Sequence, residues 1–306
     1  MSDQFGARLK AASDGDQRAL AQLLSWVEKQ GAQALRYPEL LKSARPAYRI
    51  GITGPPGAGK STLVGGLIKE LRKKNLRVAV LAVDPSSPFS HGAILGDRIR
   101  YNEHVLDDGV FIRSLGTRGS LGGLSAAAYL MLRVFDAVGF DVVLIETVGV
   151  GQTELEIMNV ADSVVVVLVP ESGDSVQAMK AGLLEIADIF VVNKADRPGA
   201  ASMAKELQFI GEIGPENRPK PKVLMTNALS FEGVLDLSVE LLGRLGDLNL
   251  IKLREQALRL RHEARALLRA EWENSIETKL KSLKKNSDLA KVLGAKTAPV
   301  KKKKRK

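Results

Sequence analysis

The 306-residue sequence contains no cysteine and only three histidines, His91, His104 and His262. The missing cysteines exclude disulfides and thiolate metal sites, and they are compatible with a reducing cytoplasm. Long apolar runs are missing too. None approaches the roughly 20 residues that a membrane-spanning helix needs, and the first residues lack the apolar segment of a signal peptide. We therefore expect a cytoplasmic protein without a transmembrane segment.

Acidic residues are outnumbered by basic ones, which gives a net charge of +10 at pH 7. Much of this excess lies at one end, because residues 301–306 (KKKKRK) are all basic and residues 279–285 add further lysines. We interpret residues 294–306 as a disordered, solvated tail. Attraction of this tail to nucleic acid or to an anionic membrane is the less favoured alternative, and we do not expect a nucleic-acid-binding protein.

A glycine-rich loop follows a short apolar run and precedes apolar residues at helical spacing. Residues 54–61 (GPPGAGKS) fit G-x-x-x-x-G-K-[S/T], and this strand, loop and helix pattern predicts a phosphate-binding loop. Lys60 is expected to reach the β- and γ-phosphates, and the Ser61 hydroxyl is expected to ligate Mg²⁺. The candidate nucleotide-binding residues of this loop are Gly54, Pro55, Pro56, Gly57, Ala58, Gly59, Lys60, Ser61 and Thr62.

Two further apolar runs each end in an acidic residue, Asp84 and Glu146. Such runs predict strands that are buried on both faces, and open α/β sheets bind ligands at the carboxyl ends of their strands. Gly149 follows Glu146 by three residues, the arrangement in which phosphate-loop NTPases present an acid to Mg²⁺ and an amide to the γ-phosphate. In phosphate-loop NTPases this acid is usually Asp, whereas this chain has Glu146. Gln152 is a candidate for orienting the attacking water, or it caps a helix.

The motif Asn193-Lys194-Ala-Asp196 follows another apolar run and predicts a guanine-binding loop. The Asp196 carboxylate can accept hydrogen bonds from guanine N1–H and the 2-amino group, which adenine does not offer in that arrangement. Hydrogen bonds to charged groups are each worth roughly 1.5–3 kcal/mol, so GTP and GDP are the expected ligands. Asn193 and the Lys194 stem would hold the loop and flank the base. The later pair Asn227-Ala228 would place a backbone amide near guanine O6.

These elements predict an α/β fold with a doubly wound, mostly parallel sheet, as in a P-loop GTPase, with helical extensions at both ends. We expect a helical N-terminal extension at residues 1–45, the GTPase domain at 46–234 and a helical element at 235–293. Apolar residues at helical spacing in this last element exceed what the outer face of one nucleotide domain needs. They predict the main contact of a homodimer.

Motifs along most of the chain resemble the MeaB/ArgK family of GTPases, which includes the methylmalonic aciduria type A protein. Besides the phosphate loop and the NKAD motif they are GDQRALA at 15–21, AVDPSS at 82–87, ILGDR at 94–98, TRGSLGG at 117–123, ETVGVGQ at 146–152 and GDSVQ at 173–177. The resemblance implies a homodimeric G-protein chaperone of an adenosylcobalamin-dependent acyl-CoA mutase, usually methylmalonyl-CoA mutase. GTP hydrolysis would be coupled to cofactor loading and protection of the mutase.

The resemblance also assigns residues. It implies that Asp84, Asp97 and Glu146 belong to the Mg²⁺ and switch regions, so the candidate metal ligands are these three and Ser61. The candidate catalytic residues are Lys60, Asp97, Glu146 and Gln152. Residues 173–180, including Lys180, would form an additional switch that communicates with the mutase. Two features depart from the family pattern: Asn227 stands where Ser is usual, and the basic tail has no counterpart.

Two other functions compete with this interpretation. A nickel-delivery GTPase of the hydrogenase or urease maturation type is disfavoured, because those sites typically use Cys and His, and this chain has no Cys and three His. A non-enzymatic scaffold would bind guanine nucleotides without turning them over, and only kinetics with the mutase separate it from a GTPase. Residues 116–123, rich in glycine, either shape a connection or sense the nucleotide.

Overall fold

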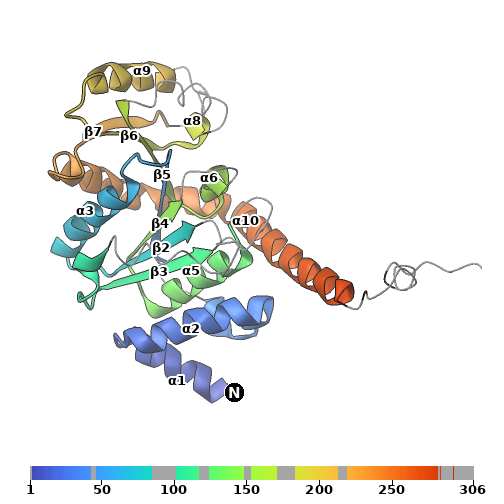
Figure 1. The fold of residues 1–306 in the computed structure, drawn as a ribbon. Helices are drawn as coiled ribbons and strands as arrows, with labels where there is room; N and C mark the ends of the chain where they lie inside the picture. The colour runs from blue at the N-terminus through green and yellow to red at the C-terminus, as the bar shows by residue number, and fades with distance from the viewer. Residues whose placement is uncertain are drawn as a thin grey trace, which may run out of the picture.

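A computed structural model describes residues 2–42, 46–84, 101–116, 124–147, 153–170, 183–212, 219–281, 283 and 292. Its centre is a seven-stranded sheet with the order β3-β2-β4-β1-β5-β6-β7, in which every neighbouring pair is parallel (Figure 1). The strands are β1 Tyr48–Thr53, β2 Val78–Asp84, β3 Val110–Gly116, β4 Val142–Thr147, β5 Ser163–Leu168, β6 Ile189–Asn193 and β7 Lys222–Thr226. The predicted fold class is confirmed.

Strand composition explains why this sheet is buried on both faces. All residues of β4, β5 and β6 are buried, as expected for central strands of a parallel sheet. Alternate residues of β2 enter two separate core clusters: Val78 and Val80 face one, and Ala79, Leu81 and Val83 face the other. The main flanking helices are α3 Lys60–Lys73, α5 Ala126–Val138 and α9 Ala200–Glu212, with short helices α6 Thr153–Glu156 and α8 Leu183–Ile186.

The N-terminal extension packs on one face of the sheet. It comprises α1 Ser2–Ser13, α2 Gln17–Gln30 and the 3₁₀ turns η1 Gly31–Arg36 and η2 Pro38–Leu40. Its buried apolar side chains join the same core cluster as those of α5, and Figure 1 shows α1 and α2 stacked beyond that helix. The Trp26 ring lies 5.2 Å from Phe5 and 5.3 Å from Tyr37, centroid to centroid. This tryptophan therefore serves packing.

Helix α10, Val234–Leu280, is one continuous helix of 47 residues. Val234, Leu237 and Leu241 are buried in the core cluster shared with α3, so the first turns belong to the nucleotide domain rather than to a separate C-terminal element. The helix then crosses the body and its outer half projects away from it (Figure 1). Along the described ranges of the chain, no helix combines the length and the hydropathy needed to cross a membrane.

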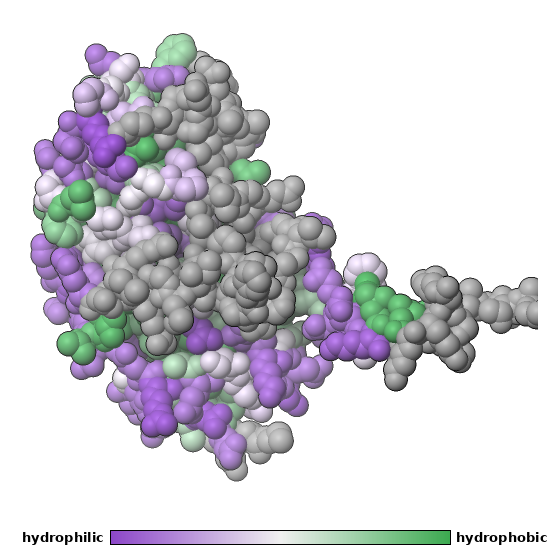
Figure 2. Space-filling view, in the orientation of Figure 1, coloured by the Kyte–Doolittle hydropathy of each residue, from purple (hydrophilic) through white to green (hydrophobic). Residues whose placement is uncertain are grey.

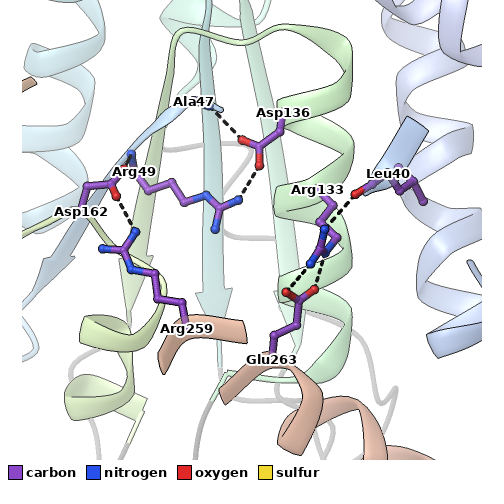
Figure 3. A network of polar contacts seen from close by, with 8 residues as sticks. All are labelled: Leu40, Ala47, Arg49, Arg133, Asp136, Asp162, Arg259 and Glu263. Carbon is purple, nitrogen blue, oxygen red and sulfur yellow. Dashed lines mark hydrogen bonds and ion pairs between the residues drawn. The ribbon is translucent and has the colours of Figure 1, made fainter. Parts of the chain in front are cut away.

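A network of ion pairs fixes the middle of α10 to the body (Figure 3). The Arg133 guanidinium on α5 donates two hydrogen bonds to the Glu263 carboxylate, at 2.5 and 2.7 Å. The Arg259 guanidinium donates to the Asp162 carboxylate at 2.5 Å. Asp162 also accepts a hydrogen bond from the Arg49 amide at 2.9 Å. Arg49 and Asp162 lie near the amino-terminal ends of β1 and β5, so α10 is anchored at the edge of the sheet opposite the carboxyl ends.

Candidate nucleotide-binding site

The glycine-rich loop connects β1 to α3 at the carboxyl edge of the sheet. The backbone φ angles of Gly54, Gly57 and Gly59 are +140°, +77° and +85°, values that residues with a side chain rarely adopt. A Cβ at Gly54 would lie 2.1 Å from the Val167 carbonyl oxygen, and one at Gly59 would lie 2.4 Å from Asn193 Nδ2. The motif therefore needs glycine at 54 and 59 for close approach as well as for backbone conformation.

Lys60, the first residue of α3, turns its side chain back over this loop. The ammonium group donates to the carbonyl oxygens of Gly54 at 2.7 Å and Pro55 at 2.9 Å, and the residue is buried. A buried ammonium is normally hydrogen-bonded in this way, because leaving it unpaired away from water is costly. The positive charge is thus held against the loop whose amides are predicted to bind phosphate.

Glu146, at the end of β4, lies between two hydroxyl groups. Ser61 Oγ donates to Glu146 Oε1 at 2.6 Å, and Tyr101 Oη donates to Glu146 Oε2. The two predicted metal ligands Ser61 and Glu146 are therefore in direct contact. Nothing in the sequence marks Tyr101 for this role, because its position next to the carboxylate depends on how distant segments meet.

The donor set fits Mg²⁺, a hard cation that prefers oxygen ligands and is usually held by one or two protein groups together with substrate phosphates. Ser61 and Glu146 supply such oxygens. Within the described part of the chain, no three His, Asp or Glu side chains gather as a metal cage would require. The backbone of Asp84 ends β2 at the same edge of the sheet, where Ala82 pairs with Glu146. Asp97, Gly149 and Gln152 lie outside the described residues.

Asn193, at the end of β6, joins the two predicted motifs. Its Nδ2 donates to the Ala58 carbonyl of the phosphate loop at 2.8 Å. Its Oδ1 accepts from Thr226 Oγ1 and from the Ala228 amide, each at 3.1 Å. The phosphate loop and the β7 loop are thus held together by one buried side chain. The Ala228 amide, predicted to lie near guanine O6, donates to Asn193, so a contact with O6 would have to share this donor.

Asp196 is exposed and is oriented by its neighbours. Lys194 adopts a left-handed conformation with a φ of 57°, and the Ala195 amide donates to the Thr226 carbonyl at 3.0 Å. Asn227 Nδ2 donates to Asp196 Oδ1 at 3.0 Å. Its own Oδ1 accepts from the Leu229 amide at 3.2 Å, which fixes the amide plane. Asn227, the departure from the family pattern, therefore supports the carboxylate predicted to recognise guanine.

A cavity of about 540 Å³ lies beside the phosphate loop and one face of α3. Its walls include Lys60, Ser61 and Glu146, and farther along α3 they include His104 and Phe231. Burial lowers the pKa of His104, so the imidazole is neutral at pH 7. Its Nε2 lies 3.1 Å from the Gly65 carbonyl, which requires the proton on Nε2. The cavity places open space against the lysine and the predicted metal ligands.

Comparison with known proteins identifies relatives of this chain. The family described as methylmalonyl-CoA mutase-associated GTPase MeaB matches residues 20–283. A candidate GTPase of Pyrococcus abyssi is 49% identical over 245 residues, which cover 78% of this chain and 74% of that protein. The mouse protein named methylmalonic aciduria type A homolog, mitochondrial, is 37% identical over 208 residues, which cover 66% of this chain and 50% of that protein.

The fold is also found in a solved structure. The crystal structure of an LAO/AO transport system kinase matches with a TM-score of 0.66 and 25% identity, covering 95% of this chain and 97% of that one. The family match spans most of the chain, including the phosphate loop, Glu146 and the NKAD motif. This chain therefore belongs to the MeaB family of GTPases.

Proposed function

We propose that this protein is a Mg²⁺-dependent GTPase of the cytoplasm that acts as a chaperone of an adenosylcobalamin-dependent acyl-CoA mutase, with methylmalonyl-CoA mutase the first candidate. The observation that carries the GTPase assignment is the Asn193 side chain, which joins the phosphate loop to the guanine motif in one site. The mutase partner is supported by the description of the family and by the name of the mouse relative.

Each residue of the site has a defined part in this proposal. Bound Mg²⁺ would neutralise charge on the phosphate oxygens, held by Ser61 and Glu146 with Asp84 and Asp97 as further candidate ligands. Lys60 stabilises negative charge that develops on the phosphates. The Gly149 amide is proposed to contact the γ-phosphate, and Gln152 is proposed to orient water.

Communication with the mutase is assigned to residues 173–180, with Lys180 as the residue proposed to contact the partner. This segment and residues 117–123 lie outside the described part of the chain. Strands that flank these segments, β5 and β3, end at the same edge of the sheet as β1 and β4. Loops leaving that edge can sense the nucleotide together, so their position supports a role as switches.

A nickel-delivery function has less support. The chain has no Cys, and His104 is engaged with the Gly65 carbonyl. A scaffold that binds nucleotide without turnover differs from the proposed enzyme only in kinetics. The two are separated by measuring phosphate release.

The proposal predicts that GTP and GDP bind in the presence of Mg²⁺ while ATP binds at least about 100-fold more weakly, because two hydrogen bonds to a carboxylate separate the bases. Calorimetry with the three nucleotides measures this preference. Equal affinity for ATP and GTP would refute the guanine assignment.

The chaperone proposal predicts that phosphate release from GTP rises when purified methylmalonyl-CoA mutase is added. Binding without any turnover, with or without the mutase, would favour the scaffold.

A homodimer is part of the proposal, and the outer half of α10 is proposed to form its main contact. Leu268 and Trp272 are one helical turn apart and are 66% and 67% exposed, although large apolar side chains are usually covered. Figure 2 shows hydrophobic surface on the outer part of this projection. Arg259, Glu263 and Leu267 dock the helix to its own body and must be retained in any test.

We predict that a chain ending at Leu267 is monomeric and still binds GDP. It loses Leu268 and Trp272 but keeps the docking ion pairs and the buried Leu267. A chain ending at residue 293 loses only the basic tail and serves as the control, which should remain dimeric. Light scattering gives the mass of each. A shortened chain that keeps the dimer mass would place the interface elsewhere.

A further inference from the structure

We propose that Tyr101 is a positioning residue for Glu146, holding this carboxylate in the orientation that the magnesium site requires. The inference rests on the proposed GTPase function and concerns one residue that no sequence motif identifies. Tyr101 is 1% exposed and Glu146 is 5% exposed, so their contact is shielded from water. Buried hydrogen bonds to an ionised group are stronger than exposed ones and fix geometry more tightly.

Glu146 stands where phosphate-loop NTPases usually carry aspartate, and this difference creates a need for support. Glutamate has one more rotatable bond than aspartate, so its carboxylate is less well fixed by the strand that carries it. In this protein the two carboxylate oxygens have different donors: Ser61 contacts Oε1 and Tyr101 contacts Oε2. A donor on each oxygen removes the freedom that the longer side chain would otherwise keep.

Tyr101 can do this because the turn that follows it is docked on α3. In this turn, η3 Asn102–His104, the His104 ring contacts the Gly65 carbonyl at 3.1 Å and Glu103 pairs with Lys69 at 2.5 Å. Slightly later, Asp107 pairs with Arg72 at 2.9 Å. These contacts involve one stripe along α3, the helix whose first turn also carries Ser61. Among the described residues, the two hydroxyl donors to Glu146 are therefore both attached to this helix.

The two donors would have different parts in a magnesium complex. Ser61 is the hydroxyl predicted to ligate Mg²⁺, so with the ion bound its oxygen would contact the cation. Tyr101 is on the other carboxylate oxygen and can stay there. Loss of the Tyr101 hydroxyl should therefore weaken the metal-bound complex, while nucleotide binding without metal should change little. If Tyr101 had a purely structural role, its loss would lower nucleotide affinity to the same extent with and without metal.

The test is Tyr101→Phe, which removes only the hydroxyl. We expect the Mg²⁺ midpoint, the Mg²⁺ concentration that gives half of the maximal stabilisation of bound fluorescent GDP, to rise by about tenfold. This is the effect of losing one hydrogen bond to a charged group. GDP affinity in EDTA should stay within about twofold of the parent. Tyr48→Phe is the matched control, because Tyr48 is also buried and its hydroxyl donates to Ser163 Oγ at 2.7 Å, a residue with no predicted part in the site. The control should keep the parent's Mg²⁺ midpoint.

A second comparison tests whether Tyr101 acts through Glu146. In a Glu146→Asp background the carboxylate is one methylene shorter and withdraws from the phenol, so adding Tyr101→Phe should not raise the Mg²⁺ midpoint further. A tenfold rise in that background, or an unchanged midpoint in Tyr101→Phe alone, would overturn the inference while leaving the GTPase assignment intact. If the parent protein binds no guanine nucleotide, the proposed function fails first and the inference fails with it.

Discussion

Lys60→Ala should lower the rate of GTP hydrolysis by at least about 100-fold while leaving a folded protein, because removing one preorganised group that stabilises transition-state charge typically costs that much. The geometry supports a large effect. The ammonium is held by the carbonyl oxygens of Gly54 and Pro55, so it needs little rearrangement to meet a phosphate bound at this loop. Alanine would leave these carbonyls without that donor and remove the positive charge.

Single-turnover hydrolysis is measured with the protein in excess over Mg²⁺·GTP and above the dissociation constant of the complex. It separates a slower chemical step from weaker nucleotide binding. Circular dichroism at the same temperature reports whether the variant is folded. Lys73→Ala is the matched control, because Lys73 lies on the same helix but pairs with Glu70 at the surface. Its turnover should equal that of the parent. Normal turnover in a folded Lys60→Ala protein would show that the phosphate loop is not the hydrolytic site.

The fold and the two nucleotide motifs were predictable because each has a local signature. Short apolar runs rich in β-branched valine, such as residues 163–168, favour strands covered on both faces, and Gly54 and Gly59 adopt backbone conformations that the glycines of the motif predict. The contacts between these motifs have no such signature. That Asn193 reaches the Ala58 carbonyl depends on the spacing of β1, β5 and β6 in the sheet.

Helical periodicity also says nothing about what an apolar face covers. Val234, Leu237 and Leu241 have the same spacing as the residues of a dimer interface, yet they pack on α3 within the core. Leu268 and Trp272, farther along the same helix, are exposed. The ion pairs of Arg133 with Glu263 and of Arg259 with Asp162 anchor the middle of α10 to the body, and the partner of a charged residue on a helix surface cannot be read from the sequence.

Asp196→Asn should change the base preference from guanine to xanthine, with GDP affinity falling by about 100-fold or more, since two hydrogen bonds to a charged acceptor are affected. The structure also indicates how the new amide would be oriented. Asn227 Nδ2 donates to Asp196 Oδ1, and Asn227 is itself held by the Leu229 amide. The oxygen of an asparagine at 196 must therefore face Asn227, which turns its NH₂ group towards the 2-position of the base. Guanine has a donor there, whereas xanthine has an acceptor.

Calorimetric titration of parent and variant with GDP, xanthosine diphosphate and ADP measures the change, and ADP should stay weak for both. The role of Asn227 is tested by adding Asn227→Ala to Asp196→Asn. Without the neighbouring donor, the amide at 196 is free to flip, so the gain in affinity for xanthosine diphosphate should shrink severalfold. If Asp196→Asn kept the parent's affinity for GDP, the carboxylate would not contact the base. If the double variant equalled the single one, Asp196 would still read the base but Asn227 would not set its orientation.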